Sequence, residues 1–238
     1  MNPTIAYMTF RGMLGRRRVI MLFLLPAMLL ALSVLLKATV TTNMLDVEVA
    51  VLQRFALATL LPLLALIAGT GVIGPEIDDG QIMYVLTKPI SRTSVIVTKY
   101  VCAVVLVTGF AVIPTVLSAV ILGENSELPG AFGIGVFVGG VAYSAIFVAL
   151  GVISRHAVTI GLIYAMVWES LVGNFAPGAK TLSVQQWALR ITDEFTTTQS
   201  INPDIGLATA VILLIVVTVG SMLLATVRLR SLTIASAE

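Results

Sequence analysis

The sequence predicts an all-α integral membrane protein with six transmembrane helices, and three observations lead to this fold class. Of the 238 residues, 58% are hydrophobic and only 11% are charged. A water-soluble fold of this composition would expose apolar surface that water penalises. The mean hydropathy of +1.04 points to lipid as the solvent. The uncharged runs are too long for strands, and lipid leaves only helices or closed barrels as spanning structures.

Six apolar segments are long enough, or nearly so, to cross a hydrocarbon core of roughly 30 Å, which takes about 20 helical residues. We expect the spans at 19–36, 55–74, 95–122, 131–153, 157–172 and 205–227. The fifth segment is short and carries Glu169, so we expect it to extend by a turn at either flank. No internal repeat or linker divides the chain, and residues 1–238 are predicted to form a single transmembrane domain.

Basic residues orient the predicted bundle, because Lys and Arg beside a span are retained on the cytoplasmic side. Ten of the 14 lie in the N-terminal arm, near the connections after the second and fourth spans, or in the C-terminal tail. Lys37, Arg54, Lys180 and Arg190 lie on the opposite side. The sequence therefore predicts a multi-pass protein of the cell (inner) membrane with both termini in the cytoplasm.

The residue content excludes several classes of function. A net charge of +2 is too balanced to indicate a nucleic-acid partner. With one His and one Cys, and without a nucleophile motif, the chain offers no catalytic or metal site, so we expect a non-catalytic subunit. A phosphate-binding loop is approached only at 173–181, GNFAPGAKT, where Ala179 is inserted before Lys180. We expect no cofactor on this chain.

The predicted cytoplasmic connection at 75–94 carries closely spaced helix signals. They are, in order, a capping box of Asp78 with Gln81, an apolar stripe of Ile82, Met83, Val85 and Leu86, a C-terminal Lys88, a stop at Pro89 and an N-cap at Ser91. This pattern predicts a short amphipathic helix between two rigid spans. The helix could rest on lipid headgroups, although the carboxylates of Glu76, Asp78 and Asp79 would be repelled by anionic lipids.

Two other segments outside the spans have helical periodicity. The N-terminal arm, residues 1–18, places Tyr7, Phe10 and Leu14 on one face among four arginines, which is typical of an elbow helix along the inner leaflet. The long extracytoplasmic connection at 173–204 has a second capping box, Ser183 with Gln186, and an apolar face that includes Trp187. We expect Trp187 in the aromatic belt at the outer interface. The segment is either a membrane-resting cap or a lid over a substrate path.

Polar and small residues inside the apolar runs suggest further roles. Glu169 is either a polar contact in a substrate path or a carboxyl that lies near the outer interface or is protonated within a packed bundle, and we take it with Trp187 as a candidate path or gate residue. We expect Lys99 to extend toward the headgroups. Gly135 and Gly139 form a GxxxG step that lets another helix approach closely, either within the bundle or from a second copy.

The segment from Glu76 to Lys99 resembles the cytoplasmic loop of ABC-2 type transporter permeases. The matching positions are Glu76, Gly80, Leu86, Pro89, Ser91, Arg92 and Lys99, while Gln81 stands where Thr is common. In that family the short helix docks into a groove on a separate ATP-binding subunit. The resemblance implies that residues coupling to that subunit are Glu76, Asp78, Asp79, Gly80, Gln81, Tyr84, Leu86, Thr87, Lys88, Pro89, Ser91 and Arg92.

The resemblance also implies an assembly and an activity. Two permease subunits, identical or different, would pair with two ATP-binding cassette subunits that hold ATP and Mg²⁺, and substrate would pass at the permease interface. An apolar interior favours export of a hydrophobic or amphipathic cargo such as a drug, a lipid or a lipid-linked molecule. The alternatives are a self-contained secondary transporter and a membrane assembly or anchoring protein without transport activity.

Overall fold

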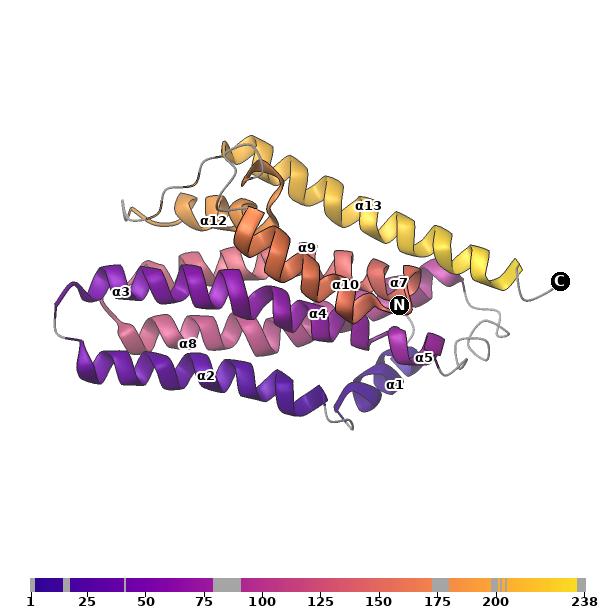
Figure 1. Ribbon diagram of the computed structural model, residues 1–238, viewed down its shortest axis with the longest axis horizontal. Coiled ribbons are helices and arrows are strands. Elements are labelled where there is room, and N and C mark those ends of the chain that lie inside the picture. The colour runs from indigo at the N-terminus through magenta and orange to yellow at the C-terminus, as the bar shows by residue number, and fades with distance from the viewer. Residues whose placement is uncertain are drawn as a thin grey trace.

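The computed structural model describes residues 3–14, 18–40, 42–78, 91–172, 180–197, 201, 203 and 205–234. Within these ranges the regular structure is helical throughout, as the composition predicts. The long helices run side by side along the longest axis of the molecule (Figure 1). The all-α fold class is therefore confirmed for the described part of the chain.

Within the described ranges, five helices are long and apolar enough to cross a membrane. They are Val19–Thr39, Met44–Ile77, Arg92–Leu122, Leu128–Ile153 and Leu207–Arg230, which cover the first, second, third, fourth and sixth predicted spans. The fifth predicted span corresponds to a shorter apolar helix, Ala157–Trp168. A multi-span membrane protein follows from these helices, while the count of six stays a prediction.

The first half of the chain forms the lower layers of Figure 1. Its elements are α1 (Pro3–Leu14), α2 (Arg18–Thr39), α3 (Met44–Ala50), the π-helical η1 (Val51–Leu60), α4 (Leu61–Gly71) and α5 (Gly74–Asp78). Then come α7 (Arg92–Val107), the π-helical η2 (Thr108–Val112) and α8 (Ile113–Leu122). Pro62 and Pro114 follow η1 and η2 closely. Because a proline ring crowds the preceding turn and donates no N–H, a widened turn before it relieves the clash.

The second half of the chain contributes the centre and the upper layer. It consists of α9 (Leu128–Ile153), α10 (Ala157–Ile163), the π-helical η3 (Tyr164–Val172), the 3₁₀ turn η4 (Lys180–Leu182), α12 (Val184–Glu194) and α13 (Leu207–Ile234). Helix α9 is the centre of the bundle, because it packs against α4, α7, α8, α12 and α13. The core is correspondingly built around α9, whose Phe132, Tyr143 and Phe147 are fully buried.

The glycine step in α9 receives α12 of the same chain. A Cβ on Gly139 would lie 3.0 Å from the Cβ of Ala188, and a Cβ on Gly135 would overlap the Oγ1 of Thr192. Both contacts come from α12, so only glycine at these positions lets the two helices approach this closely. Of the two interpretations of the GxxxG step, the structure supports contact within one bundle.

The position expected for Trp187 is wrong. Its side chain is only 2% exposed, and its indole Nε1–H donates to the carbonyl oxygen of Thr181 at 2.8 Å. Helix α12 turns its apolar face onto α9 instead of toward lipid, because Gly135 and Gly139 leave room for it. An amphipathic helix can bury its apolar stripe against lipid or against protein, and the periodicity of the sequence does not distinguish the two.

The two predicted serine caps that fall on described residues are confirmed. The Ser91 hydroxyl accepts from the backbone N–H of Ser94 at 3.3 Å and begins α7. The Ser183 hydroxyl accepts from the N–H of Gln186 at 3.4 Å and begins α12. Asp78 is the last residue of α5, and its predicted capping partner Gln81 lies outside the described residues.

Candidate functional site

The predicted coupling residues are described only at the two ends of their segment. Glu76, Ser91 and Arg92 are described in full, and Asp78 by its backbone. Outside the described residues lie Asp79, Gly80, Gln81, Tyr84, Leu86, Thr87, Lys88 and Pro89. The structure therefore describes the contacts at the two ends of the segment 79–90. We call these contacts, which Glu76 makes with Lys99 and Arg92 makes with the C-terminal helix, the base of the segment.

Lys99 of α7 forms the first half of this base. Its side chain is 0% exposed, and its Nζ donates to Glu76 Oε1 at 2.6 Å and to the carbonyl oxygen of Val72 at 2.6 Å. A longer contact of 3.5 Å reaches the hydroxyl of Thr9 in α1. The expectation that Lys99 extends to the headgroups is wrong, because these three acceptors satisfy the ammonium inside the protein.

The surroundings of Lys99 explain why a charged group is stable there. Val72 directly follows α4, where the backbone carbonyls lack helical partners and the helix dipole places negative charge. A lysine at this position caps the helix end. Glu76, 26% exposed, supplies the opposite charge that a buried ammonium requires. One side chain thus holds α1, α4, α5 and α7 together.

Arg92 forms the second half of the base. Its guanidinium Nη1 donates to the carbonyl oxygens of Arg230 at 3.0 Å and Leu229 at 3.4 Å, near the end of α13. A cation near a helix C-terminus is favoured by the helix dipole. Beneath it, Ile96 of α7 and Leu229 of α13 belong to one buried apolar cluster. The start of α7 is therefore fixed to the C-terminal helix.

These contacts gather at one end of the molecule. In Figure 1, α1, α5, the start of α7 and the C-terminal end of α13 lie at the same end of the bundle. Glu76 stands just before the segment 79–90 and Arg92 just after it. Both flanks of that segment are thus anchored to different helices of the bundle, one through Lys99 and one through α13.

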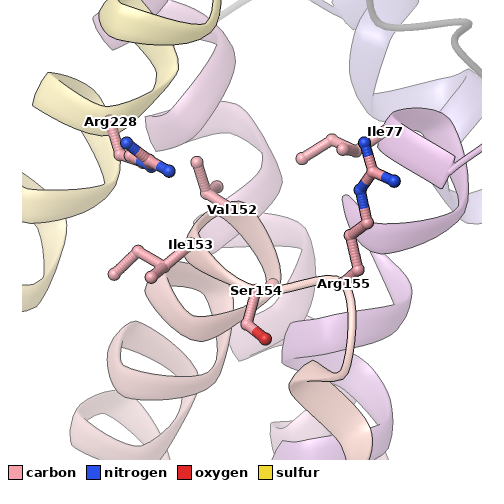
Figure 2. A pocket seen from close by; sticks show the side chains of 7 residues that line it. Ile77, Val152, Ile153, Ser154, Arg155 and Arg228 are labelled. Carbon is pink, nitrogen blue, oxygen red and sulfur yellow. The ribbon is translucent and has the colours of Figure 1, made fainter.

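A cavity of about 520 Å³ opens beside this base. It is lined by Ile77, Gly151, Val152, Ile153, Ser154, Arg155 and Arg228. Figure 2 shows Arg228 of α13 and Arg155 on either side of Val152, with the Arg155 guanidinium close to Ile77. The cavity combines two positive charges, a hydroxyl and aliphatic walls. Within the described part of the chain, no group of three or more metal-ligating side chains comes together.

The opposite end of the bundle holds a polar cluster that sequence reasoning missed. Glu48 of α3 is 0% exposed, and its Oε2 accepts from the backbone N–H of Glu124 at 3.1 Å. Lys37 donates to the carbonyl oxygen of Leu122, the last residue of α8, and pairs with Glu124 at 3.8 Å. The available signal was Glu48 itself, a carboxylate in a stretch that continues the second span toward its N-terminus.

Glu169 and Trp187, the candidate path residues, come from neighbouring parts of the chain. Glu169 lies in η3, and only its backbone is described. Trp187 lies in α12 and is packed inside the bundle. Their role in a substrate path stays a prediction.

The fold and the base together define a helical, multi-span membrane protein. The connection after its second predicted span is anchored at both flanks to helices of the bundle. A model of a known family places it more narrowly, since the model described as ABC-2 family transporter protein matches residues 14–176. This is more than half of the chain, and the protein belongs to the ABC-2 transporter family. Membership supports a permease of an ABC transporter, the membrane subunit that works with an ATP-binding partner. A search of curated proteins gives no match for this chain.

Proposed function

We propose that this protein is the permease subunit of an ABC exporter and that residues 79–90, with their flanks Glu76, Asp78, Ser91 and Arg92, couple it to a separate ATP-binding subunit. ATP and Mg²⁺ are held by that subunit, since the chain has no phosphate-binding loop. A second permease subunit completes the path, and the cargo is hydrophobic or amphipathic. The segment faces the cytoplasm, as the distribution of basic residues indicates.

The observation that carries this proposal is the double anchoring of the segment. Lys99 fixes its N-terminal flank to α1, α4 and α7, and Arg92 fixes its C-terminal flank to α13. A partner that displaces either flank, Glu76 or Arg92, therefore acts directly on the helices to which that flank is bonded. The displacement reaches four helices at once, and a bundle packed around α9 responds as rigid bodies.

The same contacts suggest how the motion would reach the path. Helix α13 and α7 both pack on α9, and α12 packs on the glycine step of α9 near the other end. Tilting α7 and α13 together shifts α9, the helix on which α12 packs. In this scheme Trp187 acts by fixing α12 against the bundle, and Glu169 lies on the neighbouring η3.

The first test is purification of the tagged full-length chain from its native membrane, followed by an assay of Mg²⁺-dependent ATP hydrolysis. We expect an ATP-binding subunit to co-purify. Gly80→Val and Arg92→Gln should leave membrane insertion and yield unchanged but lower cargo-stimulated ATP hydrolysis at least about tenfold, because each disturbs the segment or its anchor. Arg54→Gln, which removes an exposed charge outside the base, is the matched control.

Three outcomes would contradict the proposal. Unchanged ATP hydrolysis and export in both variants would show that the segment is not the coupling element. Uptake of an amphipathic dye into vesicles that contain the purified chain alone, driven by a pH gradient, would support a secondary transporter. A chain that neither transports cargo nor retains an ATPase would be an assembly or anchoring protein.

A further inference from the structure

Helix α12 reaches from the end of the bundle opposite the base to about the middle of α9. Figure 1 shows it between α9 and α13, and it packs on both. The Cβ of Ala188 would lie 3.0 Å from a Cβ on Gly139, and one turn later on α12 Thr192 lies against Gly135, one turn earlier on α9. The two helices therefore run in opposite directions.

This packing sets the depth of the inner end of α12. Gly139 lies about 16 Å from the start of α9 at about 1.5 Å per residue, which is roughly half of a hydrocarbon core of about 30 Å. Helix α12 begins at Val184, one turn before Ala188. Its first turn therefore lies near the middle of the span that α9 forms.

A polar stripe runs along α12 from this inner end toward the surface. Gln186, Arg190 and Asp193 follow at the i, i+4 and i+7 spacing that places residues on one face of a helix. Gln186 is 7% exposed, whereas the side chains of Arg190 and Asp193 are 22% and 24% exposed. Hydrocarbon offers polar groups no hydrogen bonds, so polar side chains at membrane depth usually face a partner, a ligand or water.

The inner end of the stripe holds two side-chain amides that the fold leaves unused. Gln185 is 6% exposed and Gln186 7%. Within the described part of the chain neither side-chain amide makes a hydrogen bond, and the contact of Gln186 with the Ser183 hydroxyl comes from its backbone N–H. A buried amide without a partner costs about 1–3 kcal/mol. Two neighbouring amides of this kind therefore indicate a polar ligand at this depth.

The charges along the stripe disfavour an ionic ligand of either sign. At the inner end, the N-terminus of α12 carries the partial positive charge of the helix dipole, which disfavours a cation. Toward the surface, Arg190 pairs with both Asp193 and Glu194, and the excess negative charge disfavours an anion. A carboxamide both donates and accepts hydrogen bonds, as a hydroxyl group does. A neutral group with several hydroxyls therefore matches the inner end.

We propose that Gln185 and Gln186 bind the neutral, hydroxyl-bearing head of an amphipathic cargo and that the stripe through Arg190 and Asp193 leads this head to the surface. The inference rests on the proposed function, because it names the chemistry of the exported cargo. Along the half of the bilayer that α12 crosses, the stripe replaces the hydrogen bonds that the head would lose on leaving water.

Thiol labelling of the full-length chain in phosphatidylcholine vesicles tests the route. In a Cys102→Ala background, Gln186→Cys, Arg190→Cys and the control Val216→Cys are treated with a charged maleimide that does not cross membranes. Val216 lies at a similar depth on α13 and is 59% exposed on its apolar face. Cysteines on the stripe should react at least about tenfold faster than the control, because the maleimide attacks a thiolate, which forms where water reaches the thiol. Labelling at positions 186 and 190 as slow as at 216 would overturn the route.

Three amphiphiles with the same tail test the ligand. Decyl maltoside, below its micellar concentration, should slow the labelling of Gln186→Cys, whereas decyl phosphate and decyltrimethylammonium should not. Adding Gln185→Leu should raise the concentration of decyl maltoside for half-protection roughly fivefold, because a net hydrogen bond contributes about 1 kcal/mol. Equal protection by all three would show that only the tail binds, and protection by a charged amphiphile alone would overturn the neutral head. No ATP-binding subunit is used, so a failure here leaves the coupling proposal standing, and a failure of coupling leaves the labelling pattern unchanged.

Discussion

At each end of the bundle a lysine donates to the carbonyl oxygen at a helix end, but the two lysine side chains differ in how deeply they are buried. At one end Lys99 caps the carbonyl oxygen of Val72 and pairs with Glu76 at 2.6 Å. At the other, Lys37 caps the carbonyl oxygen of Leu122 and pairs with Glu124 at 3.8 Å. The Lys99 side chain is 0% exposed, whereas that of Lys37 is 46% exposed.

Because of this difference in burial, we expect the contacts of Lys99 to matter more for stability than those of Lys37. An ion pair in water contributes little, because solvent screens both charges and already satisfies them. A buried lysine that loses its partner becomes an uncompensated charge, so its contacts are effectively obligatory. The buried Lys99–Glu76 pair lies at the end of the bundle where the segment 79–90 begins.

The largest effect is expected for Lys99→Met. The change keeps most of the side-chain volume but leaves the carbonyl of Val72 and the carboxylate of Glu76 without their cation. Breaking a fully buried pair from one side costs about 3–5 kcal/mol. The carboxylate left behind, Glu76, is 26% exposed, so we expect a loss at the lower end of that range, measured by thermal unfolding of the purified protein in detergent. The double variant Lys99→Met with Glu76→Met should recover most of it, since an apolar pair of similar volume replaces the ion pair. A double variant as unstable as the single one would contradict this account.

Glu48→Ala should give the next largest effect. The change leaves the N–H of Glu124 without its acceptor in the connection between α8 and α9, where Gly123 has φ 65°. Glu124 is exposed, so water can reach its N–H and the loss should be about 0.5–1.5 kcal/mol, the net contribution of an ordinary hydrogen bond. Glu48→Gln keeps one acceptor oxygen and should cost less than Glu48→Ala in the same unfolding assay. Equal losses would show that the charge, and not the hydrogen bond, matters at this end.

Lys37→Met should have a small effect and provides the direct contrast with Lys99→Met. Its pair with Glu124 is half-exposed, and exposed pairs contribute about 0–1 kcal/mol. The carbonyl of Leu122 can accept from water once the lysine is gone. A loss as large as that of Lys99→Met would remove the distinction between the two ends.

Sequence reasoning succeeded where the controlling interactions are local. Ser91 and Ser183 were predicted as caps because a cap is decided within four residues, and five of the apolar runs became helices of spanning length. It failed for Lys99 because its partner Glu76 is 23 residues away across a connection, and a basic residue near a span end also fits an exposed headgroup position. It failed for Trp187 because an apolar stripe packs equally well on lipid or on α9.

The smallest effect concerns Glu127, which lies outside the spans at the end opposite Lys99 and ties α9 to the chain after α12. Its carboxylate accepts from the backbone N–H of Thr197 at 2.8 Å and from the Thr197 hydroxyl at 3.0 Å. These hydrogen bonds lower the pKa of Glu127 below its usual value of 4.5. Because the folded pKa is the lower one, the tie is complete above pH 4.5 and is lost as the pH falls through the folded value. Unfolding temperatures recorded between pH 6 and pH 3 should therefore fall slightly less for Glu127→Gln than for the unchanged protein, since the amide does not titrate. Identical profiles would mean that the surface tie at this end adds nothing to stability.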